Sequence, residues 1–190
     1  MKRIITFLLC FFCLVGCSTS NLNKDISFIN ASNTTNHFKL GKTIGDTIIP
    51  SNFIYKNNYT GFEYYTEDLS YRYVFSKHPK LGNKEVLTYF YTCDINSYLL
   101  GIKVGESVND SPSQPLSANK VTTYLASLLK ENGFELIPHK KGTNQEVYFE
   151  GSNKYIWVCY ESETAFINYS YNYNSNNHEL HKFQIGLLKK

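Results

Sequence analysis

The strand-like segments in the second half of the chain are joined by short connections, and this restricts the possible folds most. Segments in which aromatic and apolar residues alternate with polar ones occupy 134–137, 146–150, 155–160 and 164–173. A parallel crossover needs a dozen or more residues, so these short connections require antiparallel pairing. The sequence therefore predicts an antiparallel meander in this half of the chain.

The first half of the chain also has the pattern of an antiparallel sheet. Segments 71–76 and 85–95 flank a turn that contains Pro79 and Gly82, which predicts a hairpin. A further strand is expected after residue 97. Glycine and proline interrupt the stretch 37–69, which leaves room for one or two strands at the sheet edge.

One helix is expected, at about 118–132. Ser117 has the side chain of an N-cap, and Gly133 after Asn132 is typical of a helix stop. Apolar residues lie on one stripe at helical spacing, namely Val121, Tyr124, Leu125, Leu128 and Leu129. We expect an α+β domain, an antiparallel β-sheet meander with this one principal helix packed on one face. A short amphipathic C-terminal helix is expected from Leu180, Phe183, Leu187 and Leu188.

The N-terminus has the pattern of a secretion signal. Lys2 and Arg3 precede an uncharged run through residue 16. This run of about a dozen apolar residues is shorter than the roughly 20 that span a bilayer. Its end, Leu14-Val15-Gly16-Cys17, resembles the lipobox of bacterial lipoproteins at all four positions. The resemblance implies that Cys17 is lipidated and that the signal, residues 1–16, is removed.

The same resemblance implies a location in the cell envelope. Ser18 follows the cysteine, and in bacteria with two membranes this is similar to the pattern of lipoproteins sent to the outer membrane. In a host with one membrane, the protein would lie on the outer face of that membrane. Serine, threonine and asparagine dominate 17–36, which predicts a flexible tether. Residues 37–190 are expected to form a single α+β domain.

Charge and motifs exclude several classes of function. Removing Lys2 and Arg3 from the 19 basic residues leaves 17, against 16 acidic ones, so nothing predicts a nucleic-acid partner. Beyond the signal, the chain lacks a glycine-rich phosphate loop, a His-Glu-x-x-His pair, a Gly-x-Ser-x-Gly turn and a Cys-x-x-Cys pair. We therefore expect no catalytic residues, no cofactor and no metal site.

Two cysteines remain beyond Cys17, and each lies in a predicted strand. Cys93 and Cys159 would be in an oxidising compartment, where they could form a disulfide. The alternative is that both are small buried apolar side chains.

Aromatic residues suggest a binding surface. The chain has 16 tyrosines and 13 phenylalanines, most of which suit a half-buried sheet. If the helix covers one face, Phe90 and Phe166 would alternate with Thr88 and Asn168 on the uncovered face. The alternative is that the C-terminal segment covers this face.

These observations lead to three hypotheses about function. By architecture, the predicted domain is similar to small envelope lipoproteins that assist assembly or inhibit other proteins. The first hypothesis is a non-catalytic binding module or assembly accessory whose partner is an envelope protein or a glycan. The second is an immunity lipoprotein that inserts loop 138–145 or 151–154 into the active site of a toxin or hydrolase. The third is an unrecognised enzyme.

Overall fold

The computed structural model describes residues 19–33, 38–93, 98–103, 116–137, 146–150, 153–174 and 178–189. Two α-helices lie in these ranges: an N-terminal helix that includes residues 19–31, and α2 (Leu116–Glu131). Two short 3₁₀ helices are η1 (Ile44–Asp46) and η2 (Pro79–Leu81). The fold class is α+β with an antiparallel sheet, as the sequence predicts, but with two helices where one principal helix was expected.

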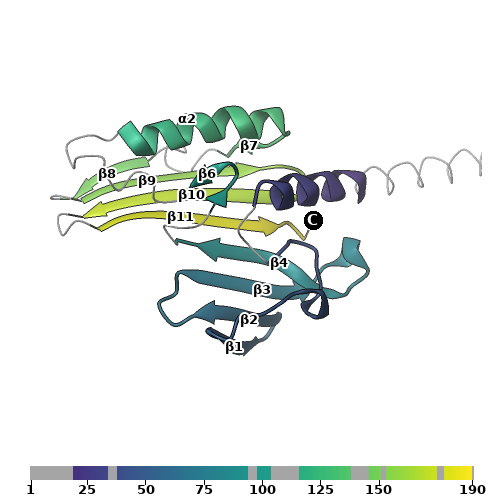
Figure 1. The fold of residues 1–190 in the computed structure, drawn as a ribbon. Helices are drawn as coiled ribbons and strands as arrows, with labels where there is room; N and C mark the ends of the chain where they lie inside the picture. Colours follow the sequence, from purple (N-terminus) through teal and green to yellow (C-terminus); the bar gives the residue numbers. More distant parts are fainter. Residues whose placement is uncertain are drawn as a thin grey trace, which may run out of the picture.

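In the described ranges, nine strands form one antiparallel sheet, which Figure 1 shows, and two more strands form a separate hairpin. The sheet strands are β1 (Phe53–Asn58), β2 (Gly61–Thr66), β3 (Tyr71–Lys77), β4 (Glu85–Thr92), β7 (Glu135–Leu136), β8 (Glu146–Glu150), β9 (Asn153–Glu161), β10 (Ala165–Asn174) and β11 (His178–Leu187). Their order is β1-β2-β3-β4-β11-β10-β9-β7, and β8 also pairs with β9. The hairpin consists of β5 (Tyr98–Leu99) and β6 (Ile102–Lys103).

The C-terminal strand β11 joins the two halves of the sheet. It pairs with β10 on one side and with β4 on the other, so Ile185 lies opposite both Ile167 and Phe90. The expected C-terminal helix is therefore wrong. Phe183, Ile185 and Leu187 alternate with less apolar residues and are all buried, which is the period of a strand with one buried face.

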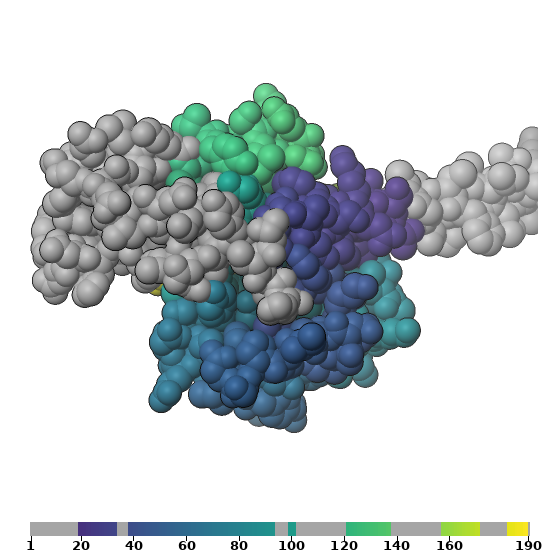
Figure 2. Space-filling model, viewed as in Figure 1, coloured from purple at the N-terminus to yellow at the C-terminus, as the bar shows by residue number. Residues whose placement is uncertain are grey.

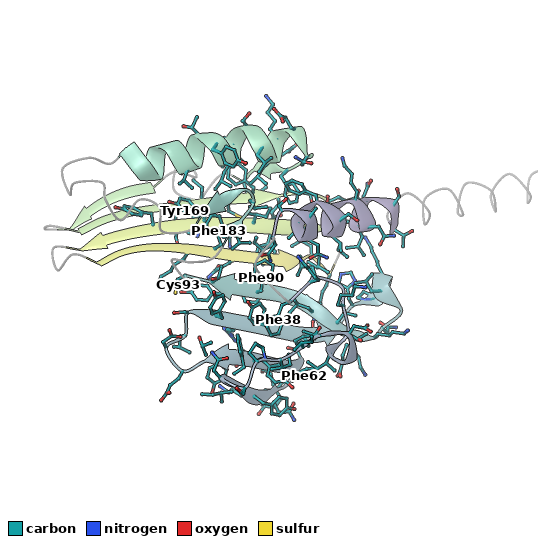
Figure 3. The ribbon with its side chains drawn as sticks, viewed as in Figure 1. Phe38, Phe62, Phe90, Cys93, Tyr169 and Phe183 are labelled. Atoms are coloured by element: carbon teal, nitrogen blue, oxygen red, sulfur yellow. The ribbon has the colours of Figure 1, made fainter. Side chains whose placement is uncertain are left out.

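Most buried apolar side chains of the strands lie on one face of the sheet, which we call the inner face. Along β10 the buried residues are Ala165, Ile167, Tyr169 and Tyr171, and the residues between them are partly exposed. Phe38 stacks on Tyr73 in this core, with ring centroids 3.6 Å apart. Figure 3 shows Phe38, Phe90, Phe183 and Tyr169 in succession across the sheet. The alternate residues form the outer face.

The N-terminal helix is part of the core. Leu22 and Ile29 have no exposed surface, and Ile26 packs against the same cluster. Figure 2 shows the helix, in purple, lying directly against the rest of the domain. The expectation of a flexible tether over 17–36 is thus wrong for residues 19–33. Leu22, Ile26 and Ile29 recur at helical spacing, and their burial outweighs the polar composition of the segment.

Polar contacts also fix the N-terminal helix to the turn between β9 and β10. The buried carboxylate of Asp25 accepts hydrogen bonds from the hydroxyls of Ser162, at 2.6 Å, and Thr164. Nearer the start of the helix, Asn21 Nδ2 donates to Glu163 Oε2 at 2.7 Å. The helix is therefore held both by apolar packing and by hydrogen bonds.

Helix α2 agrees closely with its predicted range. It ends before Gly133, whose φ of +85° is the left-handed conformation expected at a helix stop. Leu125 and Leu129 are fully buried, and the helix makes its main strand contacts with β7 and β9. In Figure 1, α2 runs alongside this edge of the sheet.

Candidate functional site

The structure separates the four residues predicted for the binding surface. Phe90 is wholly buried on the inner face, 6.2 Å from Tyr73 between ring centroids, so its placement on an open surface is wrong. Thr88 is also buried, and its Oγ1 lies 2.7 Å from Ser76 Oγ. Neither side chain is available to a ligand.

An irregularity in strand pairing explains this error. Val74 of β3 pairs with Tyr89, but the next residue, Phe75, pairs with Leu87. No residue of β3 is therefore paired with Thr88 in the strand register, and the alternation of faces reverses there. Leu87 and Phe90 both point inward, whereas a regular strand would place them on opposite faces.

Phe166 and Asn168 lie on the outer face, where both are partly exposed. The ring of Phe166 covers Gly186 of β11 so closely that a Cβ at Gly186 would lie 2.6 Å from its Cε1. Asn168 Nδ2 is 3.3 Å from Gln184 Oε1, while its Oδ1 is buried without a hydrogen-bond partner among the described residues. These two residues pack along the sheet and do not line the hollow described below.

The two cysteines are free and far apart, so the disulfide, one of the two alternatives, is wrong. The other alternative, burial of both, holds for Cys159 but not for the partly exposed Cys93. Cys93 follows β4 and Cys159 lies on β9, with β11 and β10 between them. Strands β4 and β9 are three strand spacings apart, which is about 14 Å, whereas a disulfide requires Cα atoms within about 7 Å of each other. Burial, and secondarily the charge of Glu161, raises the pKa of the Cys159 thiol to about 11. Cys159 is accordingly a neutral, buried side chain.

A hollow of about 560 Å³ lies on the outer face of the half of the sheet that contains β1 to β4. Strands β1 to β4 and β11 supply most of its lining, and the turn after β2 supplies Leu69. Three tyrosines and three charged residues make up most of its lining, which consists of Lys56, Glu63, Tyr65, Leu69, Arg72, Tyr89, Tyr91 and Gln184.

A charge pair occupies this hollow. Arg72 Nε and Nη2 lie 2.7 and 2.6 Å from Glu63 Oε2, and Lys56 Nζ lies 4.0 Å from Oε1. The carboxylate is only 5 % exposed, whereas the side chains of Arg72 and Lys56 are 47 and 64 % exposed. The hollow thus presents cationic groups around a buried anion and carries a net charge of about +1 from these three residues.

Two of the tyrosines in the lining, Tyr89 and Tyr91, are neutral hydrogen-bonding groups. Burial raises the pKa of the Tyr89 hydroxyl, against a smaller opposing effect of the Arg72 charge. Burial also raises the pKa of the Tyr91 hydroxyl, assisted by a hydrogen bond with Cys93. Both hydroxyls therefore stay protonated and can donate as well as accept a hydrogen bond.

None of the hollow's residues was singled out from the sequence. The sequence feature that indicates the hollow is a charged residue flanked by two aromatic ones, which occurs in two neighbouring strands as Phe62-Glu63-Tyr64 and Tyr71-Arg72-Tyr73. Placing Glu63 beside Arg72 also requires the pairing register of β2 with β3. Cys17 and residues 138–145, 151 and 152 lie outside the described residues.

The fold and the hollow define an α+β protein whose antiparallel sheet carries an aromatic, charge-paired recess on its outer face. Comparisons with protein-family models, curated proteins and solved structures find no match for the chain. Across the described ranges, no helix combines the length and apolar character needed to cross a membrane. Nor do three or more His, Cys, Asp or Glu side chains in those ranges gather as metal ligands.

Proposed function

We propose that the chain is the precursor of a lipid-anchored envelope lipoprotein whose domain is a non-catalytic binding module. The ligand is a glycan or a segment of an envelope protein, and it binds in the outer-face hollow. The observation that carries this proposal is the hollow itself, about 560 Å³ lined by tyrosines and a paired Arg72 and Glu63. Signal 1–16 and the lipobox at Cys17 support the envelope address.

The arrangement of the faces supports this site. The N-terminal helix contributes Leu22 and Ile29 to the core, and α2 contributes Leu125 and Leu129. In this proposal both helices cover the inner face, and the outer face is left to a ligand. Planar polar groups beside aromatic rings suit sugars and peptide backbones, which need both stacking and hydrogen bonds.

The chemistry of the hollow favours binding over catalysis. Among the described residues that line it, Glu63 is the single carboxylate, and it is paired with Arg72. Acid–base hydrolysis of a glycan requires a second carboxyl group across the scissile bond. We therefore assign Glu63 to fixing Arg72 in position.

A binding comparison between two tyrosine variants tests the site. The unlipidated chain from residue 17, with Cys17→Ser, would be used for affinity capture from the host envelope and for a panel of envelope glycans. We expect Tyr65→Ala to weaken binding at least tenfold, as removal of a contacting ring does in binding sites. Tyr124→Ala is the matched control, because Tyr124 is exposed on α2 and outside the hollow.

The experiment identifies the class of ligand and tests the location of the site. Retention of a protein identifies a protein ligand, and retention of a glycan identifies a carbohydrate. Equal binding by the two variants would place the site elsewhere.

The anchor has its own test. We expect Cys17→Ser to move the protein from the membrane fraction to the soluble fraction and to remove the mass of the acyl groups. A variant that stays in the membrane with the same mass as the wild type would contradict lipidation at Cys17.

A further inference from the structure

The N-terminal helix fixes where the proposed lipid anchor meets the domain. The helix is already bonded to the β9–β10 turn at Asn21, through Glu163, and buried at Leu22. Two residues, Cys17 and Ser18, precede the described start of the helix at residue 19. Two residues of chain span at most about 7 Å. A lipid on Cys17 would therefore hold this end of the domain directly at the membrane.

Three chain segments meet at this end of the sheet. Leu188, after β11, donates its backbone N–H to the carbonyl of Thr164 in the β9–β10 turn. Its own carbonyl lies 3.2 Å from Nε2 of His78, which precedes η2 in the β3–β4 turn. Figure 1 shows the C-terminal end of the chain beside the N-terminal helix. The β9–β10 turn, the β3–β4 turn and residues 188–189 thus form one surface, which we call the anchor-side face.

Among the described residues, lysines outnumber the exposed carboxylates of the anchor-side face, Glu85 and Glu163. Lys77, Lys80 and Lys84 belong to the β3–β4 turn and its edges, and Lys189 follows β11. All except the partly buried Lys80 are exposed. None of the four takes part in an ion pair among the described residues. Their positive charges also act on His78, whose surroundings include Lys80 and Lys189.

We propose that the anchor-side face binds anionic lipid headgroups. This inference rests on the proposed lipidation, because the anchor holds the face against the bilayer. Lysine ammonium groups bind the phosphates of an anionic leaflet, each contributing a factor of about five in affinity. The fully exposed ring of Tyr59, in the β1–β2 turn of the same end, suits the headgroup region.

The proposed orientation also places the hollow. Leu69, in the β2–β3 turn at the opposite end of the strands, lines it. From Lys77 to Arg72, β3 rises by about 17 Å at about 3.3 Å per residue. With the anchor-side face on the membrane, the strands stand away from the bilayer and the hollow lies toward their distal end.

Vesicle binding by the unlipidated chain tests this inference. The Cys17→Ser chain from residue 17 is sedimented with phosphatidylcholine vesicles and with vesicles that also contain phosphatidylglycerol. We expect binding only to the second kind, and weaker binding at higher salt. Lys84→Glu should lower the partition coefficient about 25-fold, because it changes two units of charge at this face. Lys182→Glu makes the same change in net charge in the middle of β11 and should lower it much less.

Two outcomes would overturn the proposal. The first is no binding to anionic vesicles at low salt, and the second is an equal loss in the Lys84 and Lys182 variants. Melting of each variant checks that it is folded. Because the chain used carries no lipid, these failures differ from failure of the anchor, which cell fractionation of Cys17→Ser detects.

Discussion

Replacing Leu22 by alanine tests whether the N-terminal helix belongs to the folded domain. The Leu22 side chain has no exposed surface and lies in the core cluster. Alanine lacks three of its carbons, and at about 0.8 kcal/mol each their burial contributes about 2.4 kcal/mol. The cavity that remains raises the cost to as much as about 5 kcal/mol. Such a loss is large beside the 5 to 15 kcal/mol by which a typical domain is stable.

The assay is urea unfolding of the unlipidated chain from residue 17, together with its melting temperature. For a chain of this size, 2.4 kcal/mol corresponds to a decrease of about 5 to 10 °C. Asn23→Ala is the matched control, because Asn23 is exposed on the same helix. Alanine favours a helix more than asparagine does, so this control should gain up to about 0.7 kcal/mol.

The result that refutes the reasoning is an unchanged unfolding midpoint in Leu22→Ala. In that case residues 19–31 would contribute nothing to stability, and a tether would describe them better than a core helix. An equal loss in Asn23→Ala would show instead that the helix responds to any substitution and not to burial.

Three further predictions concern the core and the outer face. Leu125→Ala should destabilise the domain by about 2 to 5 kcal/mol, measured by urea unfolding, while the exposed Tyr124→Ala should change little. Burial lowers the pKa of His78, so the folded state binds a proton more weakly than the unfolded chain, whose histidine pKa is about 6.5. The free energy of unfolding should thus fall as the pH drops below about 6.5. His78→Gln should flatten this part of the curve of stability against pH. A curve that His78→Gln leaves unchanged would contradict the prediction. Gly186→Ala should lower the free energy of unfolding by about 1 to 3 kcal/mol, because the added Cβ meets the Phe166 ring. Adding Phe166→Ala to this variant should recover part of that loss. If the effects of the two substitutions on stability are strictly additive, the contact is disproved.

The elements that the sequence predicts well are those with local signals. Helix α2 has an apolar stripe with a glycine stop, and its end was placed to within a residue or two. The hairpin of β3 and β4 follows from the turn around Pro79 and Gly82. Antiparallel pairing of β9 with β10 follows from the length of the connection alone. In each case the decisive residues are neighbours in sequence.

The N-terminal helix shows how composition can mislead. Its exposed positions carry serine, asparagine and lysine, which gives the segment the composition of a linker. The spacing of Leu22, Ile26 and Ile29 is that of a buried helix stripe, and three apolar residues are enough when each is packed. The partner of the buried Asp25 could not be inferred, since Ser162 and Thr164 lie far along the chain.

The faces of β4 could not be assigned from alternation alone. The pairing irregularity opposite Val74 and Phe75 reverses the pattern at Thr88, and no local residue such as glycine or proline marks it. Consequently Phe90 was expected on the surface, whereas it lies in the core. The hollow was missed for a related reason, because its residues come from separate strands and meet only through the register of the sheet.

Strand β11 determines how the outer face can be studied. Because it pairs with β4 and with β10, it joins the part of the sheet that carries the hollow to the part that carries Phe166. Removing residues 178–190 would take Phe183, Ile185 and Leu187 out of the core and expose the facing edges of both neighbouring strands. Two unpaired edges with exposed apolar surface favour aggregation whatever the outer face binds. A loss of binding in such a truncation would therefore say nothing about the hollow, and only single substitutions on the outer face separate binding from folding.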